Sequence, residues 1–96
     1  MSSIKRIILD VVKPHKPSIL EIANKIGDLA GISGVNISLD EMDERTESIK
    51  ITIEGGDIEY VNVEKVLTDY GASIHSIDQV SAGIRIVEEV NTPQDR

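Results

Sequence analysis

The chain has 96 residues, 40% of them hydrophobic, and a net charge of -7 from ten basic and seventeen acidic side chains. This length fits one small domain, which we expect to span residues 1–90 and to be followed by a flexible tail over residues 91–96. The sequence has no cysteine, which excludes disulfides, thiolate metal sites and cysteine nucleophiles. No apolar stretch approaches the roughly 20 residues that a membrane span needs. The acidic balance and the presence of only two aromatic residues argue against nucleic-acid binding.

The spacing of hydrophobic residues changes several times along the chain between the alternation of a strand and the spacing of a helix. Residues 4–12, 35–40 and 49–54 alternate between apolar and polar side chains and predict three strands. Ser18 and Glu21 form a capping-box pattern before a helical spacing that runs to Leu29. A second helix is predicted after residues 55–57 and ends at Gly71. A fourth strand should begin near Ser73, and residues 84–90 predict a short extra strand.

This order of elements, βαββαβ, predicts an α+β ferredoxin-like sandwich. With the strands numbered in chain order, right-handed crossovers give an antiparallel sheet in the order 4-1-3-2. Both helices should cover the same face, because each strand has only one strongly apolar side. The other face carries Ile8 and Val12 among charged residues. A half-apolar open face and a surplus C-terminal strand predict a homo-oligomer.

Both histidines and an acidic turn are predicted to gather at one end of this sheet, where the strand over residues 4–12 finishes and the strand from Ser73 begins. Asp10 and His75 would lie on neighbouring strands there and supply half of a divalent-cation site, because imidazole and carboxylate together suit a transition metal. The alternative is a hydrogen-bonded pair that orients a surface strand. The spacing fixes no third ligand, whereas a stable zinc site needs at least three.

The acidic turn over residues 40–47 is a second candidate cation site. Asp40, Asp43 and Glu44 supply oxygens of the kind that calcium and magnesium prefer. The EF-hand order of acids with a central glycine is absent, and Arg45 interrupts the run. A solvated hairpin tip is the alternative, and a cation site is favoured only where neighbouring subunits bring several such turns together.

The segment KPHKPS offers a candidate anion site. Lys13, His15 and Lys16 precede a helix whose first N–H groups and dipole favour negative charge, and Ser18 lies at the start of that helix. The alternative is structural, because Ser18 itself caps the helix and the prolines end the strand and stiffen the connection.

Three stretches of the chain resemble a family of small archaeal proteins known as a domain of unknown function. They are LDVVKPHKPSILEIA, GVNISLDEMDERTESIKITIEG and GASIHSIDQVSAGIRIVEE. The resemblance covers nearly the whole chain, and KPH followed downstream by IHSIDxVxAG is its most specific part. It implies a ferredoxin-like fold, a cytoplasmic location and assembly into homo-oligomeric rings. It implies no reaction, because the family brings no established catalytic residues.

Enzyme motifs are missing from the sequence: there is no G-x-S-x-G elbow, phosphate loop or dinucleotide fingerprint. We therefore expect an oligomeric binding or regulatory module that takes a divalent cation (calcium, magnesium or zinc) or a small ligand at the end that carries the histidines. The alternatives are a small hydrolase or transferase with His15 or His75 as general base, and a purely structural assembly protein.

Overall fold

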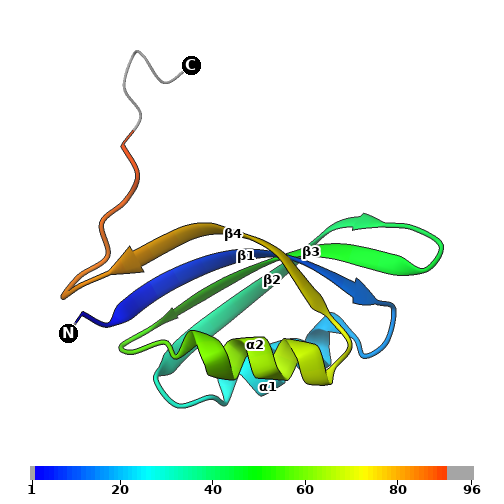
Figure 1. The fold of residues 1–96 in the computed structure, drawn as a ribbon, viewed down its shortest axis with the longest axis horizontal. Helices are drawn as coiled ribbons and strands as arrows, with labels where there is room; N and C mark the ends of the chain where they lie inside the picture. Colours follow the sequence, from blue (N-terminus) through cyan, green and yellow to red (C-terminus); the bar gives the residue numbers. More distant parts are fainter. Residues whose placement is uncertain (1, 91–96) are drawn as a thin grey trace.

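A computed structural model describes residues 2–90 and shows the order βαββαβ (Figure 1). The strands and helices are β1 (Ile4–Pro14), α1 (Ile19–Gly27), β2 (Ile32–Met42), β3 (Thr46–Gly55), α2 (Tyr60–Asp69) and β4 (Ser73–Ala82). The four strands form one antiparallel sheet in the order β2-β3-β1-β4, and both helices lie on the same face of it. The predicted α+β ferredoxin-like class, the sheet order and the one-sided helices are confirmed.

The core lies between the sheet and the helices and is built from aliphatic side chains. Paired residues of β1 and β3, such as Leu9 and Ile51, share the face that the helices cover, because partners in an antiparallel pair point the same way. Ile22 and Ile26 of α1 pack onto this face. The fully buried aliphatic side chains of the two central strands are Ile7, Leu9, Val11, Ile49, Ile51 and Ile53. The alternation read from the sequence therefore places the core correctly.

The helix boundaries follow local chemistry. α1 begins as predicted after Ser18, whose Oγ accepts a hydrogen bond from the backbone N–H of Glu21 at 3.4 Å. It ends at Gly27, earlier than the predicted Leu29. Gly31 has a φ of 84° and lies where the chain turns into β2, so tightly that a Cβ there would lie 2.0 Å from the carbonyl oxygen of Asp57. No helix of the described residues is long and apolar enough to cross a membrane.

The predicted extra C-terminal strand is wrong. Residues 84–90 follow β4 without forming a strand, and they lie on the side of the sheet opposite the helices (Figure 1). Gly83, with a φ of 117°, turns the chain away from the edge of β4, so the alternating segment has no strand to pair with among residues 2–90. The predicted flexible tail, residues 91–96, lies outside the described residues.

Candidate functional site

The end of the sheet that the sequence singled out is held together by oppositely charged side chains. The side chain of Lys13 is 0% exposed, and its Nζ lies 3.0 Å from Glu47 Oε1. The same Nζ donates hydrogen bonds to the carbonyl oxygens of Pro14 at 2.7 Å and His15 at 3.3 Å. Glu47 Oε2 lies 3.0 Å from His15 Nδ1, so one carboxylate joins the loop after β1 to the β2–β3 hairpin. We call Lys13, His15 and Glu47 the clamp.

The clamp favours the charged form of His15. His15 Nε2 lies 3.2 Å from the backbone oxygen of Glu44, so both ring nitrogens face acceptors, and only an imidazolium can donate to both. The Glu47 carboxylate, followed by the Glu44 carbonyl, raises the pKa of His15 above 6.5. His15 and then Lys13 lower the pKa of the Glu47 carboxyl below 4.5. Each partner thus stabilises the charged form of the other.

The cationic groups of Lys13 and His15 in the candidate anion site therefore already bind acceptors of the protein itself. An ammonium has three N–H donors, and Lys13 uses three acceptors inside the protein. His15 uses both ring nitrogens, and the Ser18 hydroxyl caps α1. Of the four residues that we expected to meet an anion, only Lys16 is an exposed cation with no hydrogen bond to the described chain.

In the acidic turn, Asp43 has a structural role. Its Oδ1 accepts hydrogen bonds from the backbone N–H groups of Arg45 and Thr46, both at 2.9 Å, and from the Thr46 hydroxyl at 3.2 Å. These bonds, led by the one from the Thr46 backbone, lower the pKa of the Asp43 carboxyl. Asp40 and Glu44 are exposed on the strand end and on the turn. Asp43 thus closes the hairpin, and the other two carboxylates face solvent.

Asp10 and His75 lie on neighbouring strands, as expected, but they are not opposite each other. The register partner of Asp10 is Ser76, and His75 is the extra residue of a β-bulge between the pairs Asp10–Ser76 and Val11–Ile74. His75 is exposed. Within residues 2–90, no three side chains of His, Cys, Asp or Glu come close enough together to hold a metal ion.

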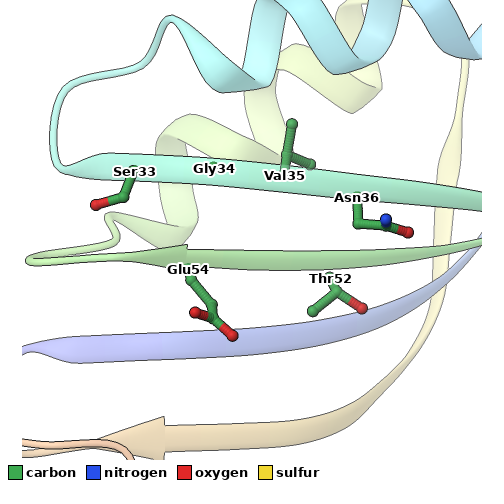
Figure 2. Close-up of a pocket in the computed structure, with 6 residues that line it drawn as sticks. All are labelled: Ser33, Gly34, Val35, Asn36, Thr52 and Glu54. Carbon is green, nitrogen blue, oxygen red and sulfur yellow. The ribbon is translucent and has the colours of Figure 1, made fainter.

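A groove that the sequence reasoning missed lies at the opposite end of the sheet. It has a volume of about 330 Å³ and is lined by Ser33, Gly34, Val35, Asn36, Thr52 and Glu54 of β2 and β3 (Figure 2). Gly34 pairs with Glu54 and Asn36 pairs with Thr52, so the groove follows two alternate pairs of the ladder, with the pair Val35–Ile53 between them. The only sign of this groove in the sequence was a serine and a glycine, Ser33 and Gly34, at the start of a strand. The same pair is also typical of an ordinary strand end.

Comparisons with known proteins agree with the resemblance read from the sequence. Residues 5–96 match the model of the family DUF211, described as "Uncharacterized ArCR, COG1888". The chain is also similar to "Uncharacterized protein MJ0319" of Methanocaldococcus jannaschii, with 48% identity over 96 residues that cover 100% of this chain and 99% of that protein. The predicted resemblance to an archaeal family of unknown function is confirmed.

Proposed function

The chain belongs to the DUF211 family, and from this premise we propose that it is a homo-oligomeric binding module whose copies join through the edges of their sheets. The observation that supports the proposal is a pair of long free edges. β2 has 11 residues and β4 has 10, and both lie at the outside of the sheet. Each edge strand carries aliphatic side chains that are about half exposed, namely Leu39, Met42, Ile77 and Val80. Long apolar edges of this kind are usually covered by another chain or element.

The direction of the strands makes the two edges complementary. Each step across β2-β3-β1-β4 is antiparallel, so β4 runs opposite to β2. A second copy in the same orientation therefore places its β4 antiparallel against β2 and continues the sheet. Such a head-to-tail contact is heterologous, and it forms a ring when the rotation between copies closes.

The same contact supports a cation site shared between copies. The start of β4 and the end of β2 lie at the same end of the sheet, so head-to-tail pairing brings His75 of one copy close to Asp40 and Glu41 of the next. Imidazole with carboxylates suits a transition metal such as zinc, and carboxylates alone suit calcium or magnesium. One chain lacks a third nearby ligand among its described residues, and the second copy supplies it.

The alternative of a hydrolase or transferase with a histidine base gains less support. A general base needs a free ring nitrogen within reach of the substrate. His15 uses both of its nitrogens in the clamp, so this alternative would depend on His75 alone.

Native mass spectrometry of the full chain with calcium, magnesium, zinc or manganese tests the proposal. We expect one defined oligomer larger than a dimer, with metal bound in proportion to the number of subunits. Val80→Lys, in the middle of the β4 edge, should dissociate it, whereas Val61→Lys on the exposed surface of α2 should not. His75→Ala should remove the metal and leave the oligomer intact.

Either part of the proposal can fail separately. A monomer, or an oligomer that Val80→Lys leaves unchanged, would overturn assembly through the edges. A defined oligomer that binds none of the four metals would overturn the shared cation site and leave the assembly standing.

A further inference from the structure

The groove between β2 and β3 owes its shape to an irregular register. Pairing shifts between Ile32–Gly55 and Gly34–Glu54, which leaves Ser33 as the extra residue of a β-bulge. In a regular strand, residues 33 and 36 would point to opposite faces. Figure 2 shows Ser33, Asn36, Thr52 and Glu54 pointing to one side of the sheet and Val35 to the other, toward the helices.

Gly34 leaves the middle of this groove empty. A Cβ built at this position would meet nothing within 4 Å, and the residue has no positive φ that would require glycine. The hollow is therefore bounded by polar side chains and has a floor without a side chain. Any β-branched residue at position 34 would fill it at little cost to the strand.

Several polar atoms around the groove have no partner within residues 2–90. Glu54 Oε2 lies 2.8 Å from both Nε and Nη2 of Arg6, whereas Glu54 Oε1 makes no hydrogen bond to the described chain. The hydroxyls of Ser33 and Thr52 make none either. Asn36 Oδ1 accepts a hydrogen bond from Ser38 at 3.3 Å, which leaves the NH₂ group of Asn36 to donate. Ser33 and Thr52 lie at opposite ends of the groove (Figure 2), so the Ser33 hydroxyl beside Glu54 Oε1 is the pair of acceptors that we assign to one primary ammonium.

A second hollow adjoins the first and carries positive charge. It has a volume of about 290 Å³, shares Ser33 and Glu54 with the groove, and extends to Lys5 and Arg85. Lys5 Nζ donates one hydrogen bond, to the carbonyl oxygen of Gly56 at 2.8 Å, and keeps two donors. Arg6 is already paired with both Glu54 and Glu88 at 2.8 Å and is not counted among these cations. Acceptors thus line the first hollow and its boundary with the second, and two cationic side chains line the second.

We propose that the two hollows together bind one small zwitterion, with an ammonium group and a carboxylate a few bonds apart, as in amino acids and dipeptides. The ammonium is held by Glu54 Oε1 and the Ser33 hydroxyl, which line both hollows, and the carboxylate is held by Lys5 and Arg85. A simple anion would be repelled by the Glu54 carboxylate, and a simple diamine would be repelled by Lys5 and Arg85. Each is therefore disfavoured by one of the two hollows. This site goes beyond the proposed function: it lies within one chain, at the end of the sheet opposite the shared cation site.

Amide NMR titrations of the full-length ¹⁵N-labelled protein test the proposal. The probes are an equimolar mixture of the standard amino acids, glycylglycine, acetate and putrescine. We expect the amino-acid mixture, glycylglycine or both to shift the amides of residues 33–36, 52–54 and 84–86 in a saturable way. Whichever of the two binds identifies the source of the zwitterion. Acetate and putrescine should bind about tenfold more weakly or not at all, the loss expected when one charge-assisted contact is missing.

Two variants locate the site, and a third serves as a control. Gly34→Val fills the groove and should abolish binding. Ser33→Ala removes the hydroxyl that meets the ammonium and should weaken binding by about tenfold. Ser48→Val lies on the same open face of β3, opposite Val12 and outside both hollows, and should bind as the unmodified protein does. The proposal is overturned if no probe binds, if acetate or putrescine binds as tightly as the zwitterions, or if neither groove variant weakens binding.

Discussion

The two ends of the sheet use their polar residues in opposite ways. At the clamp end, Lys13 uses all three donors and His15 both ring nitrogens inside the protein. At the groove end, Ser33, Thr52 and Glu54 keep polar atoms that bond to no described residue. The end with more charged residues is thus the one where the charges neutralise one another. A charged cluster in a sequence indicates a binding site only if the fold leaves its members without internal partners.

The largest expected effect on stability comes from comparing two glycines at the groove end, Gly55 and Gly34. A Cβ on Gly55 would lie 2.0 Å from the carbonyl oxygen of Gly31, so Gly55→Ala forces two backbone segments apart. We expect it to lower the free energy of unfolding by about 3 kcal/mol. Gly34→Ala meets nothing and should change the value by less than about 0.5 kcal/mol. Urea unfolding of both variants measures the difference, and equal losses would contradict the described packing.

The second-largest effect on stability is expected from a comparison of one lysine at each end of the sheet, Lys13 and Lys5. Lys13→Met leaves the partly buried carbonyls of Pro14 and His15 without their side-chain donor, which should cost about 2 kcal/mol. Lys5→Met removes a single exposed hydrogen bond to Gly56 and should cost less than about 0.5 kcal/mol. A Lys13→Met protein as stable as Lys5→Met would show that the clamp contributes nothing to folding.

The clamp also predicts how stability depends on pH. The raised pKa of His15 adds stability that is complete below about pH 6.5 and is lost as the pH rises through the folded-state value. The lowered pKa of Glu47 adds stability that is complete above about pH 4.5 and is lost as the pH falls through its folded-state value. The difference in unfolding free energy between the unmodified protein and Glu47→Gln should therefore be largest between about pH 4.5 and pH 6.5. Parallel pH profiles for the two proteins would contradict the prediction.

The smallest effect concerns the segment after β4. Glu88 pairs with Arg6 at the surface, and this contact lowers the pKa of the Glu88 carboxyl. Exposed ion pairs contribute little to global stability. Glu88→Gln should thus leave the free energy of unfolding measured in urea unchanged. It should increase the rate of amide hydrogen exchange in residues 84–90. Unchanged exchange would show that this ion pair does not restrain the segment.

The sequence predicted the fold because alternation and burial coincide in this chain. Ile7, Leu9 and Val11 face the core as their spacing indicated. Lys13 continues the same series of inward positions, so its burial was readable from the alternation, although its charge suggested a solvent-exposed ligand site. Its aliphatic stem extends the apolar face, and the acceptors for its ammonium come from the last residue of β1, from the loop after it and from β3.

Other features depend on register, which the sequence pattern does not contain. The bulge at His75 places Ser76 opposite Asp10, and the bulge at Ser33 brings two polar side chains onto one face. Residues 84–90 have the alternation of a strand, but they have no pairing partner among the described residues. Alternation predicts which residues can form a strand, and only the surrounding fold decides whether a partner is present.

The most direct test of the contrast between the two ends is an NMR titration of the His15 ring in the unmodified protein and in Glu47→Gln. If the clamp end is closed on itself as described, the His15 midpoint lies above 6.5 and falls when Glu47 loses its charge. The ring should also carry a proton on both nitrogens at pH 6. A midpoint at or below 6.5 that does not respond to Glu47→Gln would contradict the clamp and would restore Lys13 and His15 as candidate ligand-binding residues.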